Sequence, residues 1–143
     1  IKAVKFEKEG DGFTAKELWS NAENSPQFNT PVHKNGLLFG INQGNAFFCV
    51  NAQTGQSAWN APAQGGGGGR GRGGGYGSIV DAGSVLLALT PTSELIVLQP
   101  SDKEYTEQAK IKVSDTQTYA HLVVSGNRLF VKDQNSVTLW SVD

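Results

Sequence analysis

The sequence predicts an all-β chain built from repeated units of about 40 residues. Two tryptophans, Trp19 and Trp59, end similar phrases and lie one such interval apart. A second phrase, two apolar runs separated by a turn, occurs three times, at Asn35-Gly36, Gly83-Ser84 and Gly126-Asn127. The runs are short, and no long window shows the 3.6-residue period of an amphipathic helix. Short runs joined by such turns are typical of β-hairpins.

The runs divide into four groups, each with the length of a small antiparallel sheet. The first group is expected to supply two strands, at residues 2–7 and 13–19. The second and third are expected to supply four strands each, at 29–33, 37–42, 46–51 and 57–60, and at 77–81, 84–90, 94–99 and 107–113. The fourth is expected at 119–124, 128–132 and 136–142. A four-stranded unit with this period is the blade of a β-propeller, so we expect about three to four antiparallel propeller blades.

Composition and charge exclude several partners. The chain has 143 residues and a net charge of −1, which gives no reason to expect a nucleic-acid partner. No apolar run approaches the roughly 20 residues that a membrane-spanning helix needs. The single cysteine, Cys49, excludes an intrachain disulfide. The chain also contains no methionine, and with its start in the middle of a blade this predicts a segment of a longer protein.

A glycine-rich segment, residues 64–77, separates the second and third groups of strands. Glycine at this density has a high entropic cost of ordering and no side chain to pack, which predicts a flexible loop inserted between blades. An alternative is a nucleic-acid tether that uses Arg70, Arg72 and Tyr76, but two arginines in a slightly acidic chain are few for that task. A phosphate-binding loop is disfavoured because neither Lys-Ser nor Lys-Thr follows the glycines.

One phrase carries a specific resemblance. Asn51, Thr54, Gly55 and Trp59 follow an apolar strand with the spacing Asn-x-x-Thr-Gly-x-x-x-Trp. The phrase resembles the tryptophan-docking repeat of the pyrroloquinoline-quinone (PQQ)-like propeller family, in which Asp usually stands at the Asn51 position. Asparagine can still cap the turn with its side-chain oxygen, and glycine suits a residue with positive φ. Trp59 is expected to wedge against the neighbouring blade, and Trp19 ends a looser copy of the repeat. The fourth copy stops at Trp140-Ser-Val-Asp143, before any outer strand.

The resemblance implies an organisation for the whole chain. Residues 1–143 would form the carboxyl-terminal part of a larger propeller ring. The expected partners are then the remaining blades of the same protein or another copy of the chain. Such repeats in bacteria are often grouped with the propeller lipoprotein of outer-membrane protein assembly, which implies export to the periplasm.

The sequence offers little that points to catalysis. His33 and His121 are the only histidines, and both fall in predicted first strands. Asp81, Asp102, Asp115 and Asp133 are scattered and read as solvated turn residues. We therefore expect no metal site, no cofactor and no catalytic residue, although counting alone leaves a Ser–His–Asp triad open. The larger aromatic residues are expected mostly in the core: Phe39, Phe47, Phe48, Trp59, Phe130 and Trp140.

Three classes of function follow. The first is a non-catalytic binding or scaffold module whose loops bind a protein or polymer partner. The alternative is a fragment of a PQQ-dependent dehydrogenase whose active site lies in missing blades. A third is a purely structural fragment. We favour the first, because the repeat pattern comes without a recognisable catalytic constellation, and fold alone does not name a ligand.

Overall fold

A computed structural model describes residues 1–62 and 77–142, and these residues form four antiparallel sheets. Sheet 1 is a hairpin of β1 (Lys2–Glu9) and β2 (Gly12–Ser20). Sheet 2 contains β3 (Val32–Lys34), β4 (Leu37–Ile41), β5 (Ala46–Asn51) and β6 (Ser57–Pro62). Sheet 3 contains β7 (Ser78–Asp81), β8 (Leu86–Leu89), β9 (Glu94–Leu98) and β10 (Glu107–Lys112). Sheet 4 contains β11 (Val123–Ser125), β12 (Arg128–Lys132) and β13 (Val137–Ser141), and the all-β prediction is confirmed.

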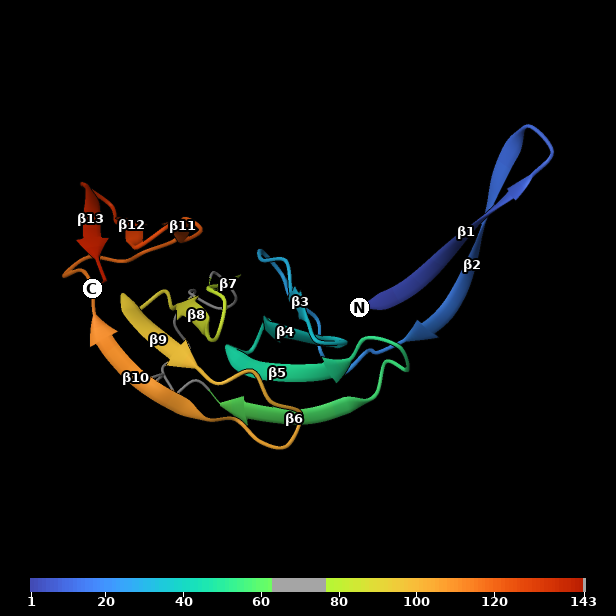
Figure 1. The fold of residues 1–143 in the computed structure, drawn as a ribbon, viewed down its shortest axis with the longest axis horizontal. Helices are drawn as coiled ribbons and strands as arrows, with labels where there is room; N and C mark the ends of the chain where they lie inside the picture. The colour runs from blue at the N-terminus through green and yellow to red at the C-terminus, as the bar shows by residue number, and fades with distance from the viewer. Residues whose placement is uncertain (63–76, 143) are drawn as a thin grey trace.

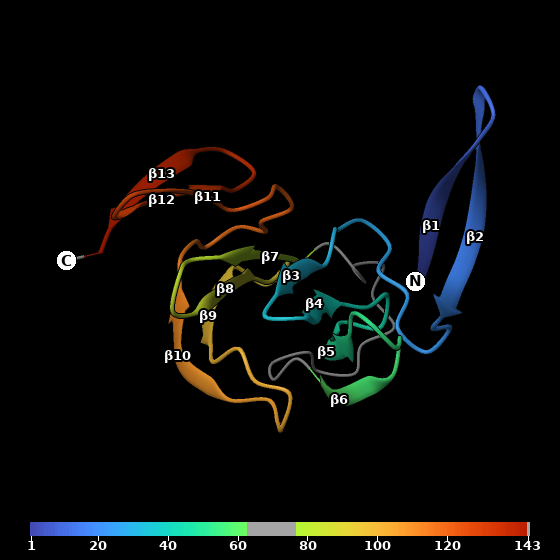
Figure 2. The same cartoon turned by 45° about the vertical axis from the view of Figure 1, so that its right-hand side comes forward.

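Each sheet is a simple meander, in which every strand pairs with the next one along the chain. Sheets 2, 3 and 4 follow one another along a curve, while the far end of the first hairpin extends away from them (Figures 1 and 2). Turns between first and second strands, and between third and fourth strands, share one end of the sheets, which we call the front face. Turns between second and third strands lie at the opposite end, the back face.

The core lies between the sheets. The first core joins sheets 2 and 3 through buried apolar side chains: Phe39, Ile41, Phe47, Cys49, Ile79, Leu86, Ala88, Ile96 and Leu98. The second core joins sheets 3 and 4 in the same way: Leu87, Leu89, Leu95, Val113, Leu122, Leu129 and Val131. Sheet 3 contributes alternate residues to the two cores, because successive side chains of a strand point to opposite faces. A strand that is buried on both faces therefore appears in the sequence as a continuous apolar run, and Leu86–Leu89 is an example.

The first strand of sheets 2 and 4 is shorter than predicted. β3 begins at Val32 rather than at residue 29, and Pro31, which has no N–H to donate, directly precedes it. β11 begins at Val123 because the N–H of Leu122 donates to Oγ of Ser78 in sheet 3 instead of to a strand partner. His121 therefore lies in the link that precedes β11, outside the strand predicted to contain it.

Trp140 is less buried than predicted, and most of the predicted loop lies outside the described residues. Trp140 was expected in the core, but its side chain is 38% exposed. It lies on β13, which forms the edge of sheet 4, and no further sheet of the described chain covers it. The predicted 64–77 loop lies outside the described residues except for Gly77, which is buried against Ile41. In the part of the chain that the structure describes, no helix is long and apolar enough to span a membrane.

The reactivity of the buried Cys49 thiol provides a test of the packing of the first core. Its side chain is fully buried, and burial, with a smaller contribution from the charge of Asp102, raises the pKa of the thiol to about 12. The reactive thiolate is therefore disfavoured in the folded chain. At about pH 8, where an unperturbed thiol is partly ionised, a maleimide should label Cys49 only as fast as the protein unfolds. Labelling of the native chain as fast as of the urea-denatured chain would contradict this packing.

Candidate functional site

The turn between β5 and β6 contains three of the residues singled out in the sequence. Oδ1 of Asn51 accepts hydrogen bonds from the backbone N–H groups of Gln53 and Thr54, at 2.9 and 3.0 Å. The N–H of Gly55 donates to the carbonyl of Asn51 at 2.8 Å, and Gly55 adopts φ of +75°. Asparagine does here what aspartate would do, since only a side-chain oxygen is required. The result is a closed turn on the front face.

Trp19 of sheet 1 lies against this turn. Its indole N–H donates to the carbonyl of Ala52 at 3.1 Å. A Cβ atom added to Gly55 would lie 2.5 Å from Cε3 of the Trp19 ring, so the ring rests directly on the glycine backbone. Glycine is required at this position for two reasons, its positive φ and its missing side chain.

Trp59 repeats the arrangement one sheet further on. Its indole N–H donates to the carbonyl of Ser101, in the turn between β9 and β10, at 2.9 Å. Its ring lies 6.1 Å from the ring of Phe39 and 5.9 Å from that of Tyr105, measured between centroids. In both cases an indole from the outer strand of one sheet binds a carbonyl in the third turn of the next sheet. Trp140 lies on a third strand, a different position in its sheet.

Sequence reasoning missed a polar cluster behind the Trp19 contact. Nδ2 of Asn21 donates to the carbonyl of Gly55 at 2.8 Å, and Nδ2 of Asn24 donates to Oγ of Ser57 at 3.0 Å. The same hydroxyl donates to the carboxylate of Glu23 at 2.7 Å. The available signal was the pair of asparagines three residues apart in a link between sheets. Tyr105 was also missed, although it is the one aromatic residue in the third copy of the turn.

A polar pocket of about 680 Å³ opens beside the docked turns, between sheets 2 and 3 on the front face. Three turns form its walls: β3–β4, β5–β6 and β9–β10. Ten residues line it: His33, Asn35, Gly36, Leu37, Asn51, Ala52, Gln53, Pro100, Ser101 and Asp102. Because Trp59 binds Ser101, the position of one wall depends on the tryptophan contact.

Several polar side chains of this pocket are available to a ligand. Within the described chain, the side chains of His33, Gln53 and Asp102 make no hydrogen bond or ion pair, and all three residues are exposed. Asp102 supplies a carboxylate, Gln53 an amide, and His33 an imidazole. Such a set can donate and accept hydrogen bonds at once. Cys49 is an unsuitable nucleophile here, because its thiol is fully buried and its pKa is raised.

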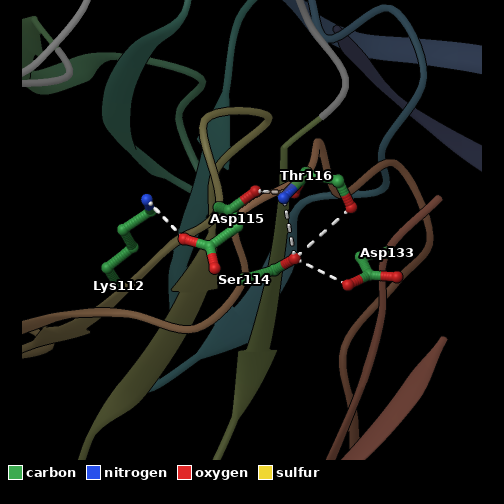
Figure 3. A network of polar contacts seen from close by, with 6 residues as sticks. Lys112, Ser114, Asp115, Thr116 and Asp133 are labelled. Atoms are coloured by element: carbon green, nitrogen blue, oxygen red, sulfur yellow. Dashed lines mark hydrogen bonds and ion pairs between the residues drawn. The ribbon is translucent and has the colours of Figure 1, made fainter. Parts of the chain in front are cut away.

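The back face carries a different polar network (Figure 3). The hydroxyl of Ser114 donates to Oδ2 of Asp133 at 2.7 Å, and Oδ1 of Asp133 accepts from the N–H groups of Asn135 and Ser136. These hydrogen bonds, that of Ser114 first, hold the pKa of Asp133 well below its usual range. Every one of these bonds ends within a turn or a link, so the network anchors the β12–β13 turn.

The described residues contain no group of three or more His, Cys, Asp and Glu side chains that could hold a metal ion. His33 lies on β3 and His121 lies in the link before β11. Asp81 pairs with Nζ of Lys34 at 2.7 Å, an interaction that joins sheets 3 and 2 and lowers the pKa of the carboxyl.

The tryptophan-on-glycine contact predicts different costs for two matched substitutions. Gly55→Ala places a methyl group into the Trp19 ring, whereas Gly36, with a nearly identical φ of +77°, has open space where a Cβ would lie. Both substitutions should cost about 1–2 kcal/mol for the left-handed backbone. Gly55→Ala should cost a further ~1–3 kcal/mol for overpacking, together with a shift of tryptophan fluorescence. Equal free energies of unfolding for the two variants would show that Trp19 does not rest on Gly55 in solution.

Comparison with known proteins identifies the fold. No protein-family model matches the chain, and no curated protein matches it. Among solved structures, the chain is similar to BamB from Moraxella catarrhalis, with a TM-score of 0.56 and 15% identity over 81% of this chain and 32% of that one. It is also similar to a chain of a mitotic checkpoint complex, with a TM-score of 0.60 and 15% identity over 89% of this chain and 40% of that one.

Both are β-propeller proteins, and this chain spans less than half the length of either. The likeness concerns the fold alone. The four sheets correspond to blades, complete or partial, and the chain has the fold of a partial β-propeller.

Proposed function

We propose that this chain is a non-catalytic binding and scaffold segment of a β-propeller with PQQ-like repeats, and that it binds a protein or polymer partner on its front face. The observation that carries the proposal is the front-face pocket with the free side chains of His33, Gln53 and Asp102. The repeat assignment is supported by the Asn51 turn and by the two indoles docked on the following turns. Export to the periplasm stays a prediction from the resemblance.

The pocket combines two properties that a recognition site needs. Gln53 and Asp102 lie on turns, which tolerate variation in sequence without disturbing the sheets, and His33 lies on the short strand β3. Two of those turns are nevertheless held in place, one by Trp19 and one by Trp59. A site whose backbone is already ordered loses less conformational entropy when it binds. Exposed carboxylate, amide and imidazole groups suit a partner rich in hydrogen-bonding groups.

The scaffold part of the proposal rests on the two open ends. Sheet 4 has three strands, and β13 forms an edge where sheets 2 and 3 carry a fourth strand. In sheet 1, Phe6 pairs with Ala15 and Phe13 with Lys8, which places both phenylalanines on one face. These side chains are 72% and 73% exposed. Unpaired edges and exposed aromatic rings favour association, so the ends would join further blades of the same protein or of another copy.

The binding part is tested with glycan and peptide arrays probed with the labelled chain. We expect reproducible binding to one array, and a loss of about tenfold or more in the Gln53→Ala/Asp102→Ala double variant, as expected for lost hydrogen bonds to exposed groups. Gln134→Ala, in a back-face turn, is the matched control and should bind like the wild type. Binding that survives the double variant, or no binding to either array, would refute the front-face assignment.

The scaffold part is tested by sedimentation velocity on the chain alone, where other copies are the only source of further blades. The sedimentation coefficient should rise with concentration. The Phe6→Ser/Phe13→Ser double variant should weaken association by about tenfold or more, because two large exposed rings are lost from the interface. Tyr119→Ser, another exposed aromatic residue, serves as control. A wild-type chain that stays monomeric at every concentration would contradict joining of the ends to another copy.

A further inference from the structure

The turn between β3 and β4 consists of Asn35 and Gly36, a dipeptide whose chemistry the proposed function does not use. Lys34 pairs with Leu37 across the turn, and φ is +52° at Asn35 and +77° at Gly36. Two positive φ values define a type I′ turn, for which asparagine followed by glycine is the preferred pair. Both residues are exposed to solvent. The backbone nitrogen of Gly36 can close a five-membered ring with Cγ of Asn35.

Such a pair can modify itself with water as the only other reactant. The nitrogen of Gly36 loses its proton to the solvent and bonds to Cγ of Asn35, while the side-chain nitrogen takes up a proton and leaves as ammonia. Water then adds to either carbonyl of the resulting succinimide ring and breaks the C–N bond there. The product is aspartate or isoaspartate, so the net change is the loss of ammonia and the gain of water. Glycine favours the attack because it has no Cβ and a permissive backbone.

Both reacting groups of this turn are free of hydrogen bonds. Within the described chain, neither the side-chain amide of Asn35 nor the N–H of Gly36 makes one. The turn is held instead through the carbonyl of Gly36, which accepts from the N–H of Ala52 at 2.9 Å. On its other side the turn joins β3, a three-residue strand at the edge of sheet 2. The local rotation that the attack requires therefore breaks few bonds.

The other asparagines of the chain lack this combination. Asn24 precedes a serine but is completely buried. Asn135 is exposed, but the N–H of the following Ser136 donates to Oδ1 of Asp133 at 2.6 Å. Asn127 lies in the matching hairpin turn of sheet 4 after the glycine instead of before it, so an arginine follows it. The rest also precede residues larger than glycine: Asn21, Asn29, Asn42, Asn45, Asn51 and Asn60.

The position of the turn gives the reaction a consequence for the front-face pocket. Asn35 and Gly36 both line this pocket, and Asp102 supplies the one carboxylate among its described lining residues. Conversion of Asn35 adds a second carboxylate. It also replaces an amide, which donates and accepts hydrogen bonds, with a group that only accepts them. A modification that changes charge in this way alters which partner groups the pocket attracts or repels.

We propose that Asn35-Gly36 is a site of spontaneous deamidation in the folded chain, and that the reaction adds a negative charge to the front-face pocket. The reaction depends on the turn alone. Its effect on a ligand rests on the proposed function of the pocket. Absence of binding on the arrays and absence of deamidation are therefore separate results, and each bears on its own proposal.

The test incubates the whole folded chain at mildly alkaline pH and follows every asparagine by peptide mapping and mass spectrometry. Asn35 should react at least about tenfold faster than any other asparagine, because it alone combines exposure, a glycine neighbour and an unbound N–H. Gly36→Ala should slow the reaction by about tenfold or more, because the added methyl group hinders the attack. That methyl group has open space around it, so the variant should fold.

Ser136→Gly is the matched variant, because it gives Asn135 a glycine neighbour whose N–H can still donate to Asp133. In the folded variant, Asn135 should react at least about tenfold more slowly than Asn35, since that hydrogen bond must break first. In the urea-denatured variant the bond is absent, and the two sites should react at similar rates. Similar rates in the folded variant, an unchanged rate in Gly36→Ala, or a wild-type Asn35 no faster than the other asparagines would each overturn the proposal.

Discussion

The architecture depends on one repeated interaction, an indole N–H of one sheet bound to a backbone carbonyl in the third turn of the next. Small sheets have too little apolar surface to be stable alone, and they become stable by stacking. The indole contributes apolar area between sheets, and its hydrogen bond fixes where along the turn it lies. Trp19 and Trp59 make this contact at distances of 3.1 and 2.9 Å. A repeat that keeps the tryptophan keeps both packing and alignment.

The front-face pocket is a consequence of this contact. The turns that accept the indoles are the same turns that form two of the pocket walls, since Ala52 and Ser101 both line it. The side chains of His33, Gln53 and Asp102 make no hydrogen bond or ion pair that holds the described sheets together. These side chains can therefore vary for recognition while the backbone beneath them stays in place.

The sequence predicted the features that depend on neighbouring residues. It predicted less well the features that depend on contacts between residues far apart along the chain. Alternating short runs and turn residues predicted nearly every strand, because both depend on neighbouring residues. The strand around His121 was misplaced because a hydroxyl of Ser78, 44 residues from Leu122, takes its hydrogen bond. The burial of Asn24 and the role of Tyr105 depend likewise on sheets that meet only in space. The burial of Trp140 was wrongly predicted because the alternation of apolar and polar residues indicates on which face of a sheet a side chain lies. It does not indicate whether another sheet covers that face.

The two cores use different means of holding neighbouring sheets together. The first contains the packed aromatic rings of Phe39, Phe47, Trp59 and Tyr105, whereas the second is built from smaller aliphatic side chains. At the back end of the second core, the link between β10 and β11 joins both flanking turns. Thr118 donates to the carbonyl of Thr90 in the β8–β9 turn at 2.7 Å, and Ser114 donates to Asp133 in the β12–β13 turn. Hydrogen bonds made by this one link therefore connect turns of two neighbouring sheets, a means of alignment that needs no large side chain.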